Sequence, residues 1–420
     1  MKSITATDLV HFRENYHHSS LNKHIERQIT KHGLEEPLID HRILRENPAR
    51  FNLVLPSYHH YDQHNSGRCW CFSGINTIEG DIAHNLNIIP RRFALSANFL
   101  TFYDKLEKTN FLYNYVLERD VTFNQLRQTV FREQDPLCEG SYFDTFANLV
   151  YKYGLVPLSV MPENQNTNNS RDHFLHLWRE KARSDALELF ESKFHLSTTK
   201  LYELKKQKLS EIYALLSKIS GEPPAQFNYK YLDRSGHLVH LRNYTPAHFR
   251  DEFLTLNLRK FRLICCNPLR KYYTSQTIEK GYSDNPFHPE IKYLNLPKSD
   301  MKKLAVMQLQ AGLPVKMGAR IRLFKHQDVP ILDTRLYNYR PLGLEPVDYE
   351  TGIKTRLVEA QHGMVILGAQ IENGHPVRWK VENSHAEAQF YTMNDNFFDA
   401  CVVNISIYED ILRQSGIKQT

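Results

Sequence analysis

The sequence predicts an α+β protein that consists of a helical lobe, a large helical insertion and a β-rich lobe. Three observations lead to this prediction. Apolar residues recur at helical spacing early in the chain, charged amphipathic stretches follow residue 172, and the last third alternates apolar and polar residues around turn sequences. With 420 residues, 41% of them hydrophobic, the chain has enough apolar side chains for a sizeable core.

The first lobe is expected to be mainly helical. One helix begins at Cys69 and reaches Ile82, because apolar residues recur every three or four positions between them. Ser96 is expected to open a second helix, since a serine side chain can accept from the free N–H groups of a first turn. The polar segment of residues 163–172, ENQNTNNSRD, is interpreted as a linker.

The insertion and the last lobe follow this segment. Amphipathic helices are predicted up to Gly221, and a hairpin is predicted around residues 233–236. In the last third, two strand-like runs flank Asn373 and Gly374, a pair that tolerates the positive φ angles of a tight turn. The expected units are residues 1–162 with the N-terminal arm and helical lobe, residues 163–300 with the insertion, and residues 301–420 with the β-rich lobe.

Composition limits the class of protein. A formal charge of +6 over 53 basic and 47 acidic residues favours a mixed surface, and leaves open only a weak, salt-sensitive affinity for nucleic acid. No stretch approaches the roughly 18 apolar residues of a membrane span, and no signal peptide is evident, so a soluble, cytoplasmic protein is expected. Six irregularly spaced cysteines favour reduced thiols. We expect no cofactor, and no metal because the histidines around Tyr61 lack a distal ligand pair.

The strongest chemical signal lies at Cys69. A Ser-Gly turn at residues 66–67 delivers this cysteine to the start of a helix, where free N–H groups and the helix dipole favour a thiolate. Gln63 and the Cys69 N–H are expected to hold the oxyanion that forms when the sulfur attacks a carbonyl. His362 begins one predicted strand and Asn383 ends its partner, so His362 is the candidate base and Asn383 orients its ring. A lone cysteine is more often a structural thiol, but the four residues together favour catalysis.

These residues and their surroundings resemble the bleomycin hydrolase and aminopeptidase C family of papain-like cysteine peptidases. The segments QHNSGRCW, LSANFLTFYDKLEKTNFL, NLVYKYGLVPLSVMPE, ISGEPPAQFNYKYLD and VRWKVENS look like family landmarks in family order. The 293 residues from Cys69 to His362 exceed the roughly 130–150 of short papain-type chains, and the insertion supplies the excess. The resemblance implies a papain-like cysteine peptidase fold, release of N-terminal residues from peptide substrates through a thioacyl-enzyme, and a homohexamer.

Three features depart from the family pattern. Relatives carry an extended C-terminal arm that limits them to aminopeptidase action, whereas this sequence stops soon after its last core strand. The family follows its Asn383 equivalent with Ser-Trp-Gly, so His385 in place of the tryptophan is expected to leave the bond from Asn383 to His362 wetter and weaker. The sequence Cys-Glu-Gly replaces Asp-Gly-Gly at residues 138–140, and Glu139 and Gly140 are predicted to contact substrate, with Glu139 narrowing the cleft or pairing with a free ammonium group.

The leading hypothesis is a cysteine aminopeptidase that uses Cys69, His362, Asn383 and Gln63. A first alternative is an endopeptidase, deamidase or acyltransferase with the same residues, which the short C-terminus favours. A second is a degenerate, non-catalytic oligomeric scaffold, for which the altered loop after Asn383 is the argument. Hydrolysis of N-blocked peptides separates the first two hypotheses, and replacement of Cys69 tests both against the third.

Overall fold

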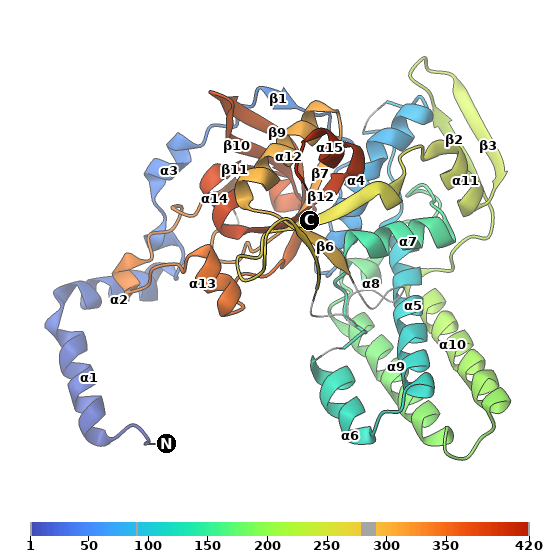
Figure 1. Cartoon of the computed structure of the whole chain (residues 1–420), viewed down its shortest axis with the longest axis horizontal. Coiled ribbons are helices and arrows are strands. Elements are labelled where there is room, and N and C mark those ends of the chain that lie inside the picture. The colour runs from blue at the N-terminus through green and yellow to red at the C-terminus, as the bar shows by residue number, and fades with distance from the viewer. Residues whose placement is uncertain (1, 90, 134, 279–290, 327, 419–420) are drawn as a thin grey trace.

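The computed structural model describes residues 2–89, 91–133, 135–278, 291–326 and 328–418. A group of long helices packs beside one large sheet, and an N-terminal arm extends away from both (Figure 1). The arm consists of α1 (Ala6–His18) and α2 (Ser20–His32), and neither helix has a buried residue.

The helical lobe is built around α4 (Cys69–Asn85) and α5 (Ala97–Glu118). The Ser96 side chain caps α5 by accepting from the Phe99 N–H. The helices α7 (Phe143–Tyr153), α9 (His173–Ser192) and α10 (Thr198–Ser220) pack against this pair and one another (Figure 1). Gly221, with a φ of 82° to 92° like other glycines after helices, ends α10 at its C-cap with a φ of 92°. The helix starts at Cys69 and Ser96 and the helical insertion are therefore confirmed.

Shorter helices connect these elements. They are α3 (His41–Glu46), α6 (Phe123–Gln125), α8 (Gln165–Asn168), α11 (Pro246–Phe253), α12 (Lys298–Gln310), α13 (Tyr349–Lys354), α14 (Asp395–Cys401) and α15 (Glu409–Gln414), with 3₁₀ turns η1 (Glu36–Leu38), η3 (Leu258–Lys260), η4 (Arg340–Leu342) and η5 (Ala386–Ala388) and the π-helical η2 (Leu126–Glu133). The predicted hairpin is formed by β2 (Phe227–Leu232) and β3 (Leu238–Tyr244).

The large sheet has ten strands within the described residues. Their order is β5 (Thr274–Thr277), β6 (Lys292–Asn295), β4 (Phe261–Cys265), β12 (Val402–Tyr408), β7 (Val315–Ala319), β9 (His362–Glu372), β10 (His375–Glu382), β11 (Phe390–Asn394) and β8 (Ile331–Leu332), with β1 (Leu53–Val54) pairing with β9. Asn373 and Gly374 have φ angles of 50° and 80° and close the β9–β10 hairpin, as predicted.

Two large apolar cores fill the molecule. The first runs from Tyr61 to Phe261 and joins the helices of the first lobe to those of the insertion. The second runs from Ile264 to Leu412 and lies between the sheet and the helices α12, α14 and α15. The predicted border between residues 162 and 163 falls inside the first core, and the division into three units stays a prediction.

Residues 163–172 do not form a free linker. The Asn164 side chain caps α8, and Thr167 donates back through a reciprocal pair of hydrogen bonds with the Asn164 backbone and side chain. Thr167 and Ser170 are only 2% and 1% exposed. The short polar side chains that suggested a loop instead satisfy backbone groups and pack against the first lobe. The linker interpretation was therefore wrong.

Candidate active site

The Cys69 turn, residues 63–69, brings Cys69 to the N-terminus of α4 at the boundary with the sheet. Two hydrogen bonds close the turn: Ser66 Oγ donates to the Gln63 carbonyl at 2.6 Å, and Gln63 Nε2 donates to the Ser66 carbonyl at 2.8 Å. Gly67 is required because a Cβ at this position would lie 2.7 Å from the Glu139 Cβ. The backbone of the turn is therefore fixed before any substrate arrives.

The Cys69 thiol is partly exposed and interacts with His362. Burial raises the pKa of Cys69, but the hydrogen bond and charge of His362, helped by the Gly363 N–H, outweigh burial and lower it to about 7. Burial lowers the pKa of His362, whereas the hydrogen bond and charge of Cys69 and the bond to Asn383 raise it above its usual value. The two groups therefore favour a thiolate and an imidazolium near neutral pH.

Asn383 orients the His362 ring. His362 begins β9 and Asn383 directly follows β10, and the antiparallel pairing of the strands brings both to one end of the hairpin. His362 Nε2 and Asn383 Oδ1 lie 2.7 Å apart, and Asn383 Nδ2 donates to the Ala388 carbonyl at 3.0 Å. Because Nε2 is engaged by Asn383, Nδ1 is the ring nitrogen left for Cys69. The structure thus brings Cys69, His362 and Asn383 together.

His385 covers this hydrogen bond. Its ring stacks on that of His362 with the centroids 5.6 Å apart and 26° between the planes. Asn383 is 2% exposed and the bond between Asn383 and His362 is buried. The expectation that His385 leaves the bond wet was therefore wrong, because an imidazole provides a flat cover. Burial and the charge of His362 lower the pKa of His385 to about 4, so this second ring is neutral at pH 7.

Gln63 is tied to the loop after Asn383. The Gln63 N–H donates to the Ser384 carbonyl at 2.8 Å, and Ser384 Oγ donates to Gln63 Oε1 at 2.7 Å. These bonds fix the amide so that Nε2 points back to the Cys69 turn. Ser384 is a site residue that sequence reasoning missed, and its place next to Asn383 was the only available signal.

A cleft of about 340 Å³ lies beside Cys69, and Glu139 and Gly140 both line it. The Glu139 carboxylate is already engaged: it accepts from the Gly67 N–H at 2.8 Å and from Ser170 Oγ at 2.5 Å, and it lies 3.6 Å from Lys105 Nζ. These contacts make Glu139 a support of the Cys69 turn. A role for Glu139 and Gly140 in substrate binding stays a prediction.

Residues 163–172 also support the turn. The Arg171 N–H donates to the Asn65 carbonyl at 3.3 Å, and Asn65 Nδ2 donates to Asp172 at 2.9 Å. The buried Arg68 side chain pairs with Glu163 at 2.6 Å. The segment therefore acts as a brace on one side of Cys69, which its composition did not indicate.

The remaining cysteines are free thiols. Cys71 is fully buried, and burial raises the pKa of its thiol well above the usual range, which agrees with the core position that was predicted for it. Within the described ranges, no helix is long and apolar enough to span a bilayer. The same residues contain no group of three or more acidic, histidine or cysteine side chains arranged to bind a metal ion.

The model of the Peptidase C1-like family matches residues 3–419. The chain therefore belongs to the Peptidase C1-like family, and it is a cysteine peptidase. Among its relatives, it is 28% identical over 395 residues to Aminopeptidase C of Listeria monocytogenes, which covers 89% of this chain and 87% of the relative. It is 29% identical over 429 residues to Aminopeptidase G of Lactobacillus delbrueckii subsp. lactis, which covers 97% and 94%.

A solved structure agrees with this assignment. The crystal structure of PepW from Lactobacillus rhamnosis HN001 matches with a TM-score of 0.88 at 26% identity, over 98% of this chain and 94% of that one. The family match and this similarity confirm the predicted α+β papain-like fold and the resemblance on which the prediction was based.

Proposed function

We propose that the protein is a cysteine aminopeptidase in which Cys69 is the nucleophile, His362 the general acid and base, and Asn383 the residue that orients His362. The observation that carries this proposal is the continuous chain of contacts from Asn383 Oδ1 through the His362 ring to the Cys69 thiol. The relatives described above are named aminopeptidases, which supports a substrate with a free N-terminus.

The reaction proceeds in two halves. The Cys69 thiolate attacks the carbonyl carbon of the scissile amide, while the Cys69 N–H and Gln63 Nε2 donate to the oxyanion. His362 then transfers its Nδ1 proton to the leaving nitrogen, the C–N bond breaks, and a thioacyl-enzyme remains. In the second half, His362 takes a proton from water, the resulting hydroxide attacks the thioester, and the free acid leaves as the thiolate is restored.

An endopeptidase or acyltransferase that uses the same residues is the second candidate. Within the described residues, nothing after Asn404 lines the cleft, because α15 packs against α12 and β12 as part of the second core. A substrate with a blocked or extended N-terminus would therefore find the cleft unobstructed by these residues. This observation keeps the specificity of the site open to test.

The test uses two matched fluorogenic aminoacyl amides under reducing conditions, one with a free and one with a blocked α-amino group. We expect wild type to hydrolyse the free amine, and Cys69→Ala to abolish hydrolysis. Cys138→Ala is the matched control, because Cys138 is also a partly exposed thiol of the same lobe. Hydrolysis of both substrates would favour the endopeptidase, and activity that survives Cys69→Ala would contradict the mechanism.

The pH dependence of alkylation tests the thiolate directly. Because the pKa of Cys69 is lowered to about 7, its reaction with iodoacetamide should rise with pH through about 7 rather than through the range of an ordinary thiol. His362→Ala removes the largest contribution that lowers this pKa, and should move the rise to higher pH. An unchanged profile in the variant would mean that His362 does not stabilise the thiolate.

We further propose a cytoplasmic homohexamer. The N-terminal arm supports assembly, because α1 has no buried residue and leaves Leu9, Val10 and Phe12 each about half exposed. Mass photometry of the wild type should show six copies, and a monomer at micromolar concentration would contradict the proposal. The weak affinity for nucleic acid stays a prediction, and a filter-binding assay at two salt concentrations tests it.

A further inference from the structure

Lys316 lies on β7 and lines the cleft that contains Cys69. Its neighbours in the strand, Val315 and Met317, belong to the second apolar core. Because successive side chains of a strand point to opposite faces, Lys316 points to the other face, against which α4 packs. The residue is only 6% exposed. Its charged end therefore enters the cleft from a largely buried position.

The Lys316 ammonium has no hydrogen-bond or ion-pair partner among the residues that the structure describes. Other buried lysines differ: Lys108 lies 3.0 Å from Asp104, and Lys105 lies 3.6 Å from Glu139. A buried cation without a partner is unfavourable, and such groups gather at functional sites. Burial accordingly lowers the pKa of Lys316 to about 8, against the opposing effects of Cys69 and Asp144.

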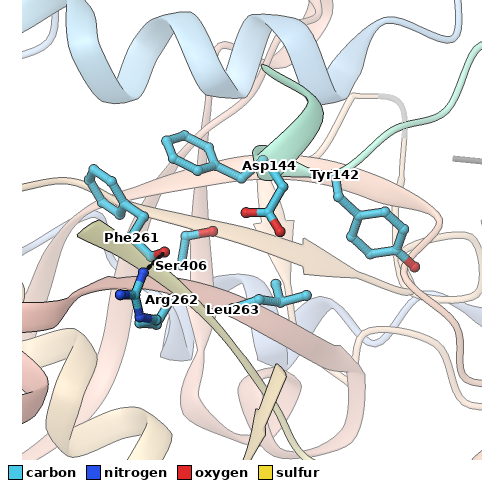
Figure 2. A pocket seen from close by; sticks show the side chains of 7 residues that line it. Tyr142, Asp144, Phe261, Arg262, Leu263 and Ser406 are labelled. Carbon is cyan, nitrogen blue, oxygen red and sulfur yellow. Dashed lines mark hydrogen bonds between the residues drawn. The ribbon is translucent and has the colours of Figure 1, made fainter. Parts of the chain in front are cut away.

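Asp144 does not neutralise Lys316 by contact. It lies at the start of α7 and lines a narrow crevice that adjoins the cleft, since Tyr142 lines both. Figure 2 shows the Asp144 side chain over Leu263 and Ser406, which belong to β4 and β12. The carboxylate therefore acts on Lys316 through space, and the ammonium remains available to a ligand in the cleft.

The rest of the cleft favours an anion. Arg171 and Arg179 also line it, and Glu139 is the one acidic residue of its described lining. The Glu139 charge is already matched by Lys105. The cleft also has room near Lys316, because the neighbouring strand pair is formed by two glycines, Gly318 and Gly363, and carries no side chain.

We propose that Lys316 binds a carboxylate of the substrate, so that the enzyme prefers peptides with aspartate or glutamate at the residue whose carbonyl is attacked or at the residue before it. The proposal rests on the proposed function, because it takes Cys69 as the position of the scissile bond. The physical reason is the unpaired ammonium in the same cleft: a substrate carboxylate supplies the partner that the protein does not.

Peptide binding to the full chain with Cys69→Ala tests the proposal, because bound peptides then stay intact. Two pairs of labelled peptides are compared by fluorescence anisotropy; in each pair glutamate is exchanged for glutamine, at the attacked residue or at the preceding one. We expect the glutamate peptide to bind about 10- to 100-fold more tightly in at least one pair. In Cys69→Ala with Lys316→Met, this preference should disappear. Equal affinities in both pairs before Lys316 is changed would overturn the proposal.

Arg171→Met in the same background is the matched control, because Arg171 is a cleft cation whose side chain is 57% exposed. We expect it to keep most of the preference, and the preference to persist when salt is raised, since a buried pair is screened less than an exposed one. An equal loss with Arg171→Met would assign the preference to the general field of the cleft and overturn the role of Lys316.

Two further readouts separate this inference from others. If Lys316→Met shifted the pH profile of Cys69 alkylation while the glutamate preference remained, Lys316 would support the thiolate and the proposal would be wrong. Hydrolysis of the same peptides by wild type is measured separately. Its absence would count against the proposed aminopeptidase, whereas the ratio of the binding constants alone decides the assignment of Lys316.

Discussion

Two buried glutamates lie on either side of the Cys69 turn, and they carry opposite charges states for a reason that the structure shows. Glu139 accepts from the Gly67 N–H and the Ser170 hydroxyl. Glu79, in α4, likewise accepts from one backbone N–H, that of His59, and from one hydroxyl, that of Tyr61. Each carboxylate therefore has two uncharged donors, and both residues are less than 9% exposed.

The charged neighbours differ. Burial raises the pKa of Glu139, but the ammonium of Lys105 leads the effects that outweigh burial and lower it below the usual value. Burial raises the pKa of Glu79 to about 8, because its two donors offset only part of the effect and the nearby Glu382 raises it further. One glutamate is ionised at pH 7 and the other is mostly protonated. The comparison teaches that two neutral donors do not keep a buried carboxylate charged, and that one cation does.

Lys105→Met should break the comparison most strongly. It leaves the Glu139 carboxylate buried without its cation, and removal of one partner of a buried pair costs about 3–5 kcal/mol. The pKa of Glu139 in the variant should rise above the unfolded value. The deficit should therefore be smallest below about pH 4.5, where Glu139 is protonated in both states, and should grow as the pH rises. Equilibrium unfolding in urea at pH 5 and pH 8 measures both quantities.

The control for this variant is the double substitution Lys105→Met with Glu139→Gln. Because it removes both charges, it should recover part of the lost stability and most of the added pH dependence. If Lys105→Met alone cost less than about 1 kcal/mol, the cation would not be what keeps Glu139 ionised.

Glu79→Gln should have the next largest effect, and only at high pH. The folded pKa of Glu79 is about 8 and its model value is 4.5, so the folded state holds the proton more tightly. The stability that this contributes is fully present below about pH 4.5 and is lost as the pH rises through about 8, a change on the order of 3 kcal/mol. The glutamine cannot ionise, so the variant should unfold at nearly the same urea concentration at pH 6 and pH 9. An equally steep loss in wild type and variant would show that other groups cause it.

The sequence was sufficient to place Cys69, His362 and Asn383, because each lies at the boundary of an element with a strong local signal. A turn before a helix marks Cys69, and the Asn373–Gly374 turn sets the pairing that brings His362 and Asn383 together. The class of fold followed from periodicity and from the resemblance, which the family match confirmed.

The partners of Glu139 could not be predicted in this way. Lys105 and Ser170 lie 34 and 31 residues away in sequence, on opposite sides of it, and Ser170 belongs to the segment that was taken for a linker. The cover that His385 forms over His362 was also missed, because substitution of a tryptophan suggests loss of a shield until the stacking of the two rings is seen. These features depend on tertiary contacts that a polar or apolar pattern does not encode.

Glu382→Gln should have the smallest effect, and it sharpens the comparison by changing only the charged neighbour of Glu79. Burial raises the pKa of Glu382 to about 7, and its Oε1 is buried without a hydrogen-bond partner within the described residues. The variant should lose the part of the pH dependence that centres near 7, about 1 kcal/mol between pH 6 and pH 8. It should also lower the pKa of Glu79, because the charge that raises it is gone. The remaining loss of stability should then begin at a lower pH than in wild type. If the midpoint of that loss did not move, Glu382 would not act on Glu79, and burial with too few charged donors would alone explain why Glu79 holds its proton.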